Sequence, residues 1–147
     1  MPGFNGIAWF EIGTDDPAAA ERFYGDVLGW TVAHDPQSPA YSVFSTGDVD
    51  GVHGGLFATE GKFPSYAVFS VIVEDVAATC RRAEEAGGKV LRAPQVSPDG
   101  LTFAHLLDPA DNHFEVFTPP RSAQFLVKRR ICAFAVHPEG SMIGPRL

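Results

Sequence analysis

Residues 7–32 read IAWFEIGTDDPAAAERFYGDVLGWTV and carry the signals for a strand, a helix and a second strand, in that order. IAWFEIGT is aromatic and apolar enough for a strand, and Asp15-Asp16-Pro17 supplies a helix N-cap followed by proline in the first turn. Apolar residues then recur at helical spacing as far as Gly29, which ends the helix before the next strand.

The same order returns at residues 66–90, YAVFSVIVEDVAATCRRAEEAGGKV, at a gap-free offset of 59 that places Asp16 on Asp75 and Gly29 on Gly88. Further strand candidates follow each helix: YSVFST and GGLF in the first half, LTFAHLL and HFEVF in the second. Self-similarity at a fixed offset indicates duplication. The sequence therefore predicts an α+β fold of two βαβββ modules, about 6–59 and 65–118, forming curved mixed sheets around a cup with the helices outside.

The 147-residue chain has a formal charge of −7, and this charge is unevenly spread. Residues 1–120 hold 6 basic and 17 acidic side chains, a net of −11, which leaves +4 on residues 121–147. An acidic body repels phosphate backbones, so nucleic-acid binding is not expected. A cationic small molecule would be attracted.

No apolar run approaches the ~20 residues of a membrane span, and the N-terminus lacks the basic-then-apolar order of a signal peptide. We predict a cytoplasmic protein without a membrane partner. Cys80 and Cys132 are too few for a disulfide framework and are interpreted as packed thiols. The glycine patterns that bind nucleotides are missing, which disfavours such cofactors.

Glu115 lies inside the apolar run NHFEVF at residues 112–117. A carboxylate removed from water needs a metal, a cation or a hydrogen-bond donor. The sequence leaves three interpretations of Glu115 open: a metal ligand, a polar anchor in a ligand pocket, or a solvent-facing strand residue.

Two segments, IAWFEIGTDDPAAAERFYGDVLGWTV in the first half and GGKV…DPADNHFEVF in the second, make the chain resemble the vicinal oxygen chelate superfamily. That superfamily includes glyoxalase I, extradiol dioxygenases, fosfomycin-resistance transferases and bleomycin-resistance proteins. The resemblance covers roughly residues 6–118 and implies a single domain over residues 1–120. Residues 121–147 would then be a C-terminal extension.

In metal-dependent members, the resemblance implies ligands from the first and last strand of each half. Carried over at the offset of 59, these positions are Trp9, Leu56, Val68 and Glu115, of which Glu115 alone can donate to a divalent ion. We therefore predict no metal and no cofactor. Glyoxalase, dioxygenase and thiol-transferase activities are not expected, because in those relatives the metal acts as a Lewis acid or binds oxygen.

The alternative is a displaced metal site, whose members would be polar residues near the strands: Glu11, His53, His105 and His113. Strand alternation puts Glu11 on the face of Trp9 and His113 on the face of Glu115. Same-face neighbours along one strand are ~7 Å apart, which is too far for both to bind one ion at ~2 Å. We interpret His53 and His113 as turn or rim histidines.

A cup without a metal can hold an organic molecule. Trp9 would offer a flat apolar platform, and Glu11 and Glu115 would supply negative charge, which suits an aromatic or cationic guest. The predicted ligand-binding residues are Trp9, Glu11, Tyr41, Leu56, Phe57, Tyr66, Val68, His113 and Glu115.

The function predicted from these residues and the resemblance is a metal-independent small-molecule binder of the resistance or sequestration type, acting as a homodimer. One alternative is a lyase or isomerase in which Glu11 and Glu115 serve as catalytic acid and base. Another is a metalloenzyme with displaced ligands. In the tail, FLV and ICAFAV are too apolar to stay in water, so we expect it to dock on the acidic body or on a second protomer.

Overall fold

The computed structural model describes residues 3–121, 135–136 and 142–143. The first half consists of β1 (Ile7–Thr14), α1 (Pro17–Leu28), β2 (Thr31–His34), β3 (Tyr41–Ser45) and β4 (Gly54–Ala58). The second half consists of β5 (Tyr66–Ile72), α2 (Val76–Glu85), β6 (Lys89–Val96), β7 (Thr102–Leu107) and β8 (His113–Thr118). Two short strands, β9 (Ala135–Val136) and β10 (Met142–Ile143), pair with each other.

Both helices begin where the sequence predicts, and α1 ends at Gly29 as predicted, whereas α2 already ends at Glu85, before Gly87-Gly88. The Asp16 side chain accepts a hydrogen bond from the Ala19 backbone N–H at 3.0 Å, and Asp75 does the same for Ala78 at 2.9 Å. Such caps satisfy N–H groups that have no partner within the helix. Gly29 ends α1 in the left-handed conformation, with φ of 71°.

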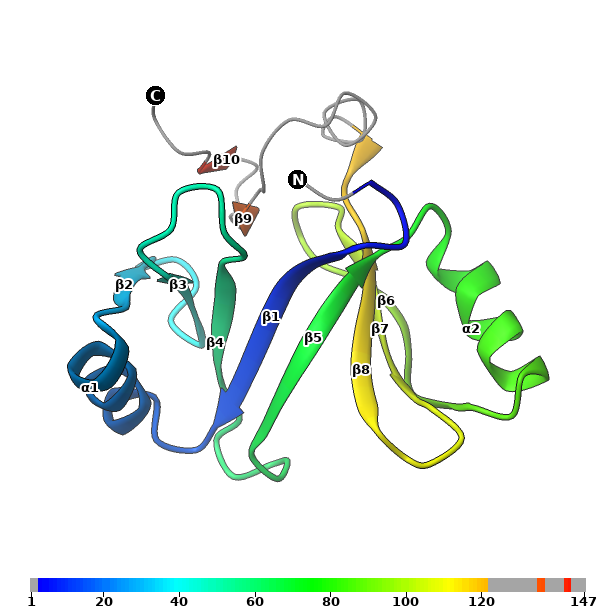
Figure 1. Cartoon of the computed structure of the whole chain (residues 1–147), viewed down its shortest axis with the longest axis horizontal. Helices are drawn as coiled ribbons and strands as arrows, with labels where there is room; N and C mark the ends of the chain where they lie inside the picture. The colour runs from blue at the N-terminus through cyan, green and yellow to red at the C-terminus, as the bar shows by residue number, and fades with distance from the viewer. Residues whose placement is uncertain (1–2, 122–134, 137–141, 144–147) are drawn as a thin grey trace.

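The first eight strands form one mixed sheet in the order β2-β3-β4-β1-β5-β8-β7-β6. β1 pairs parallel to β4, β5 pairs parallel to β8, and the two halves join through the antiparallel pair β1 and β5. Figure 1 shows α1 and α2 at opposite ends of the sheet, outside it. The α+β class and the curved mixed sheet with outer helices are thus confirmed.

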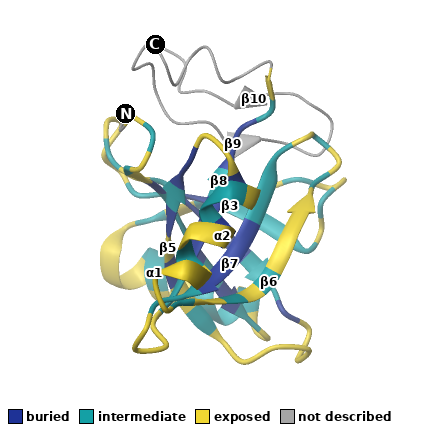
Figure 2. Cartoon of the chain, turned by 90° about the vertical axis from the view of Figure 1, so that its right-hand side faces the viewer, coloured by how far each residue is buried: buried dark blue, intermediate teal, exposed yellow. Residues whose placement is uncertain are grey.

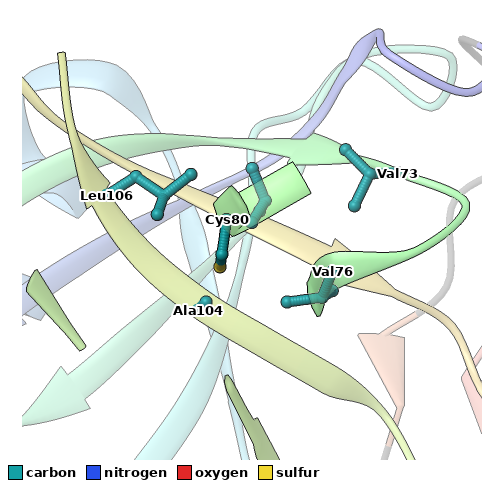
Figure 3. Close-up of a cluster of buried hydrophobic side chains, with 6 residues drawn as sticks. Val73, Val76, Cys80, Ala104 and Leu106 are labelled. Atoms are coloured by element: carbon teal, nitrogen blue, oxygen red, sulfur yellow. The ribbon is translucent and has the colours of Figure 1, made fainter. Parts of the chain in front are cut away.

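The two helices are buried to different extents. α2 buries Val76 and Cys80 in a core with Ala104, Leu106 and Val116 (Figure 3). No residue of α1 is fully buried. Figure 2 shows α2, which is mostly exposed or half-buried, in front of β7, whose middle is buried. The second half therefore contains the better sealed hydrophobic core.

Within the described residues, no helix is both long and apolar enough to cross a lipid bilayer. The cytoplasmic location stays a prediction. Cys80 is a buried free thiol, as predicted, whereas Cys132 lies outside the described residues. Most of the predicted C-terminal extension, including FLV, also lies outside them.

Candidate functional site: a cavity with a buried polar cluster

A cavity of about 320 Å³ lies within the curved sheet. Its walls come from both halves of the chain and consist of Trp9, Glu11, Ala33, Asp35, Ser38, Tyr41, Val43, Phe57, Tyr66, Arg92, Ser97, Pro98, Asp99, Leu101, Phe103, His105, Glu115 and Phe117. Aromatic side chains and a few convergent polar groups are the usual composition of a small-molecule site. The cavity is therefore the candidate site.

Six of the nine residues predicted to bind ligand line this cavity: Trp9, Glu11, Tyr41, Phe57, Tyr66 and Glu115. Both predicted catalytic candidates, Glu11 and Glu115, are among them. Val68 and His113 instead line a second pocket, which shares Tyr66 with the cavity. Ligand binding by the six remains a prediction, but the structure does bring them together.

The placement of Leu56 at the cavity was wrong. Leu56 is 2% exposed and lies on the opposite face of β4 from Phe57, because successive strand residues point to opposite faces. Register explains the error: Glu11 pairs with Gly55, and Ser70 pairs with Glu115. Glu11 to Ser70 is an offset of 59, whereas Gly55 to Glu115 is an offset of 60. The last strands of the two halves are therefore related by 60 residues, not 59. A difference of one residue moves the predicted position to the other face of β4.

One row of residues crosses four strands and carries the polar part of the site. Trp9 on β1 pairs with Ser70 on β5, Ser70 pairs with Glu115 on β8, and Glu115 pairs with His105 on β7. Glu11 lies two residues after Trp9 and therefore on the same face. Residues far apart in the sequence thus become neighbours across the sheet.

Glu11, His105 and Glu115 form what we call the polar cluster. Each offers one donor atom, and the three donor atoms all lie within 4.8 Å of one another. His105 Nε2 lies 3.3 Å from Glu115 Oε2, and the Tyr66 hydroxyl donates to Glu11 Oε1 at 2.6 Å. All three members of the cluster are buried, at 4 to 9% exposure.

His113 supports this cluster and is more than a rim histidine. Its Nε2 lies 2.8 Å from His105 Nδ1, so one imidazole orients the other. His53 behaves as predicted for a turn histidine, since its Nδ1 accepts a hydrogen bond from the Thr46 backbone N–H at 3.2 Å. The two histidines that the sequence treated alike therefore differ in role.

Burial controls the protonation of both carboxyl groups. Removal from water raises the pKa of Glu115 to about 8, with a further rise from the nearby Glu11 charge, while Ser70 and Arg92 oppose the shift. Burial also raises the pKa of Glu11, against the lowering effect of the Tyr66 and Tyr41 hydroxyls and of Arg92. Two close carboxyl groups out of water do not ionise independently.

Burial acts in the opposite direction on the imidazoles. It lowers the pKa of His105 to about 4, helped by His113 and Arg92, and it lowers the pKa of His113. His105 is therefore neutral at pH 7. His105 and Glu115 are in contact, and burial favours the uncharged form of each.

An aromatic wall surrounds the polar cluster. The Trp9 indole N–H donates to the Tyr41 hydroxyl at 3.2 Å, which locks both rings in place. The Arg92 guanidinium carbon lies 5.6 Å from the centre of the Phe103 ring and 5.8 Å from that of Phe63, within cation–π range. The cavity therefore offers several flat surfaces.

The donor atoms of a displaced metal site lie closer together in the structure than spacing along one strand would allow. Same-face neighbours along one strand are ~7 Å apart. The polar cluster instead uses three strands: β7 and β8 are neighbours, ~4.8 Å apart, whereas β5 lies between β8 and β1, so the long Glu11 side chain reaches across it. The donors of Glu11, His105 and Glu115 therefore approach within 4.8 Å. The absence of a metal stays a prediction, but distance between the donors no longer supports it.

Sequence reasoning missed the contribution of the β6–β7 hairpin. Arg92 pairs with His105 across this hairpin, and Phe103 lies on the same face as His105. The alternation of side chains along LTFAHLL could have revealed this contribution. Ala104 and Leu106 pack under α2, so Phe103 and His105 point to the other face, toward the cavity.

Comparison with known proteins agrees with this architecture. A family model for the glyoxalase/bleomycin resistance protein/dioxygenase superfamily matches residues 6–116. "Putative glyoxylase CFP32" of Mycobacterium tuberculosis is 33% identical over 117 residues, covering 77% of this chain and 44% of that protein. "Anthracycline biosynthesis protein DnrV" of Streptomyces peucetius is 28% identical over 144 residues, covering 84% and 46%. The chain thus spans less than half the length of these relatives.

The fold is also found among solved structures. Methylmalonyl-CoA epimerase from Mycobacterium tuberculosis superposes with a TM-score of 0.55 at 16% sequence identity, covering 83% of this chain and 94% of the epimerase. At that identity the likeness concerns the fold alone. With the family match over residues 6–116, these comparisons show that the chain belongs to the glyoxalase/bleomycin resistance protein/dioxygenase superfamily.

Proposed function

We propose that the protein binds a small organic molecule with a planar aromatic part inside the cavity. The observation that carries this proposal is the composition of the cavity wall, where six aromatic rings surround two buried carboxyl groups. The rings belong to Trp9, Tyr41, Phe57, Tyr66, Phe103 and Phe117. Aromatic walls bind flat molecules by stacking and by removing apolar surface from water.

The polar end of the ligand would meet Glu11 and Glu115. Carboxyl groups suit a cationic or hydrogen-bond-donating group, and the net charge of −11 over residues 1–120 attracts cations toward the body. A cation also gains from the electron-rich faces of the aromatic rings. We therefore expect an aromatic amine to bind more tightly than an aromatic acid of the same size.

The aromatic wall supplies most of this affinity, so binding itself would not require a metal. We propose a binder of the resistance or sequestration type, acting as a homodimer. The names of two relatives suggest different ligands to test: one relative is named for anthracycline biosynthesis, and the other is named a glyoxylase. An anthracycline therefore belongs in the first panel of ligands.

The test is calorimetric titration with naphthylmethylamine, methylnaphthalene, naphthoate and one anthracycline, with and without EDTA. The amine should bind at least about tenfold more tightly than the acid, a difference of ~1.4 kcal/mol. EDTA should not weaken its binding. If the acid binds as well as the amine, or if none of the probes binds, the proposed ligand class is wrong.

The two tryptophans provide an internal control for the location of binding. Trp9 lines the cavity, whereas Trp30 packs in an aromatic cluster with Phe10, Tyr24 and Phe44. Ligand should quench the fluorescence of Trp30→Phe, which keeps Trp9, and should leave that of Trp9→Phe nearly unchanged. The reverse pattern would place binding outside the cavity.

Recovery of the ligand separates binding from catalysis. A binder returns the ligand intact after incubation, as chromatography with mass detection would show. If the ligand is consumed and Glu11→Gln or Glu115→Gln stops its consumption, the alternative of a lyase or isomerase using these carboxyl groups replaces the binder.

A further inference from the structure

The polar cluster contains a donor set for a metal ion that differs from the set implied by family resemblance. The resemblance points to Trp9, Leu56, Val68 and Glu115, of which Glu115 is the sole donor. The structure adds Glu11 on β1 and His105 on β7, so that three buried donor atoms lie within 4.8 Å of one another. Two of the three donors thus stand at positions outside that pattern.

The spacing of these donors fits a small ion. Zinc binds imidazole nitrogen and carboxylate oxygen at ~2.0–2.2 Å, so two donors on one tetrahedral ion lie about 3.4 Å apart. His105 Nε2 and Glu115 Oε2 are already 3.3 Å apart. The longest separation within the cluster, at most 4.8 Å, closes with a small rotation of a flexible glutamate side chain.

Outer contacts hold the donors as a metal site requires. His105 Nδ1 faces His113 Nε2 at 2.8 Å, which leaves Nε2 directed at Glu115. The Tyr66 hydroxyl holds Glu11 at 2.6 Å. Metal-binding histidines usually have such a partner on the second ring nitrogen, and metal-binding carboxylates are usually hydrogen-bonded as well.

The charge balance of the cluster also favours a cation. Within the described residues, the ion pairs include none between Lys or Arg and either Glu11 or Glu115, although Arg92 lines the same cavity; Glu115 lies against the imidazole of His105. Two carboxyl groups lie side by side out of water, where each opposes the ionisation of the other unless a cation lies between them. A divalent cation would neutralise both.

We propose that Glu11, His105 and Glu115 form a binding site for one divalent transition ion of the zinc class, at the polar end of the cavity. Imidazole favours zinc, cobalt and nickel over magnesium and calcium, which prefer oxygen donors alone. Three protein ligands leave a coordination position open toward the cavity, where a bound ion supplies Lewis acidity. This inference does not depend on the proposed aromatic ligand.

The test measures metal directly on the full chain. Protein without an affinity tag is stripped with EDTA, transferred to metal-free buffer and titrated with Co²⁺ and with Zn²⁺. Visible absorption of bound Co²⁺ and calorimetry with Zn²⁺ report binding without any substrate. We expect one ion per chain, with cobalt absorption typical of a four- or five-coordinate site.

Variants place the ion within the cluster. His105→Gln and Glu11→Gln should weaken Zn²⁺ binding more than Tyr66→Phe, for which loss of an outer contact is worth about 10–100-fold. The matched control is His34→Gln, because His34 Nε2 lies 3.0 Å from Glu21 in an exposed pair. That variant should bind as the unmodified chain does. Circular dichroism confirms that each variant is folded.

Several results would overturn the inference. The first is the absence of stoichiometric Zn²⁺ and of cobalt absorption in the unmodified chain, a measurement that needs no variant. The second is folded His105→Gln protein that keeps full affinity. The third is loss of binding in His34→Gln, which would assign the ion to an adventitious surface pair. None of these results would affect binding of the aromatic probes in EDTA.

Discussion

At the scale of single residues, the width of the cavity depends on a glycine. Gly55 pairs with Glu11, and a Cβ added to Gly55 would lie 1.8 Å from the Tyr41 hydroxyl oxygen. That hydroxyl is the acceptor for the Trp9 indole. Only a residue without a side chain lets Tyr41 reach Trp9 across β4.

Gly55→Ala should therefore displace Tyr41 and break its hydrogen bond with Trp9. We expect the free energy of unfolding to fall by about 1–3 kcal/mol, as overpacking usually costs, and aromatic ligands to bind more weakly. Urea unfolding and calorimetry measure the two effects. Gly3→Ala is the control, since nothing lies within 4 Å of a Cβ at that position. Equal stability of the two variants would contradict the expectation.

Cys80 offers a second test at this scale. Its side chain is 6% exposed, and burial raises the pKa of the thiol, helped by the nearby Glu84 charge. Because the thiolate is the reactive form, iodoacetamide should label Cys80 far more slowly than it labels glutathione at pH 7.5. Mass spectrometry of the Cys80 peptide, with and without urea, measures the rate. Rapid labelling without urea would show that the α2 core is open.

At the scale of elements, the two helices have matched caps but unequal packing. Asp16 and Asp75 each accept a hydrogen bond from the backbone N–H three residues later. α2 buries Val76 and Cys80, whereas no residue of α1 is fully buried. The duplicated sequence therefore produces two helices whose contributions to global stability differ.

The caps test this difference. Asp75→Ala should lower the free energy of unfolding by about 1 kcal/mol, the usual cost of losing a helix cap. Asp16→Ala should cost less, because α1 can fray without opening a sealed core. Urea unfolding measures the global effect, and hydrogen exchange locates the fraying. If the two variants lose the same stability, the unequal packing of the helices has no energetic consequence.

At the scale of the whole molecule, charge and length raise the question of assembly. Residues 1–120 carry −11 and residues 121–147 carry +4, so the two parts attract each other within one chain or between chains. A homodimer is the expected state. The tail is the part of the sequence expected to dock on the body or on a second protomer.

Light scattering coupled to gel filtration tests this expectation on the full chain and on a chain ending at Arg121. The full chain should have twice the mass of a single chain. If the tail contributes to assembly, the shortened chain should dissociate at lower concentration, and the difference should shrink in high salt, which screens exposed charges. Unchanged dimerisation of the shortened chain would exclude a role for the tail in assembly.

The sequence by itself was sufficient to predict both helices and the strands of the eight-stranded sheet. Local signals lie within a few residues of the feature they control: Asp16 and Asp75 cap the helices, Gly29 ends one, and IAWFEIGT is aromatic and apolar enough for a strand. Because these effects depend on near neighbours, they predicted the order of the elements and the α+β class.

The polar cluster was decided by tertiary structure alone. Glu11, His105 and Glu115 meet because β1, β8 and β7 lie in a particular order and register within one sheet. Register depends on turn lengths and on packing across the whole sheet. An error of one residue in the predicted register placed Leu56 on the wrong face of its strand. Spacing along a chain measures distances within one strand, whereas the site is built across strands, and only folding sets those distances.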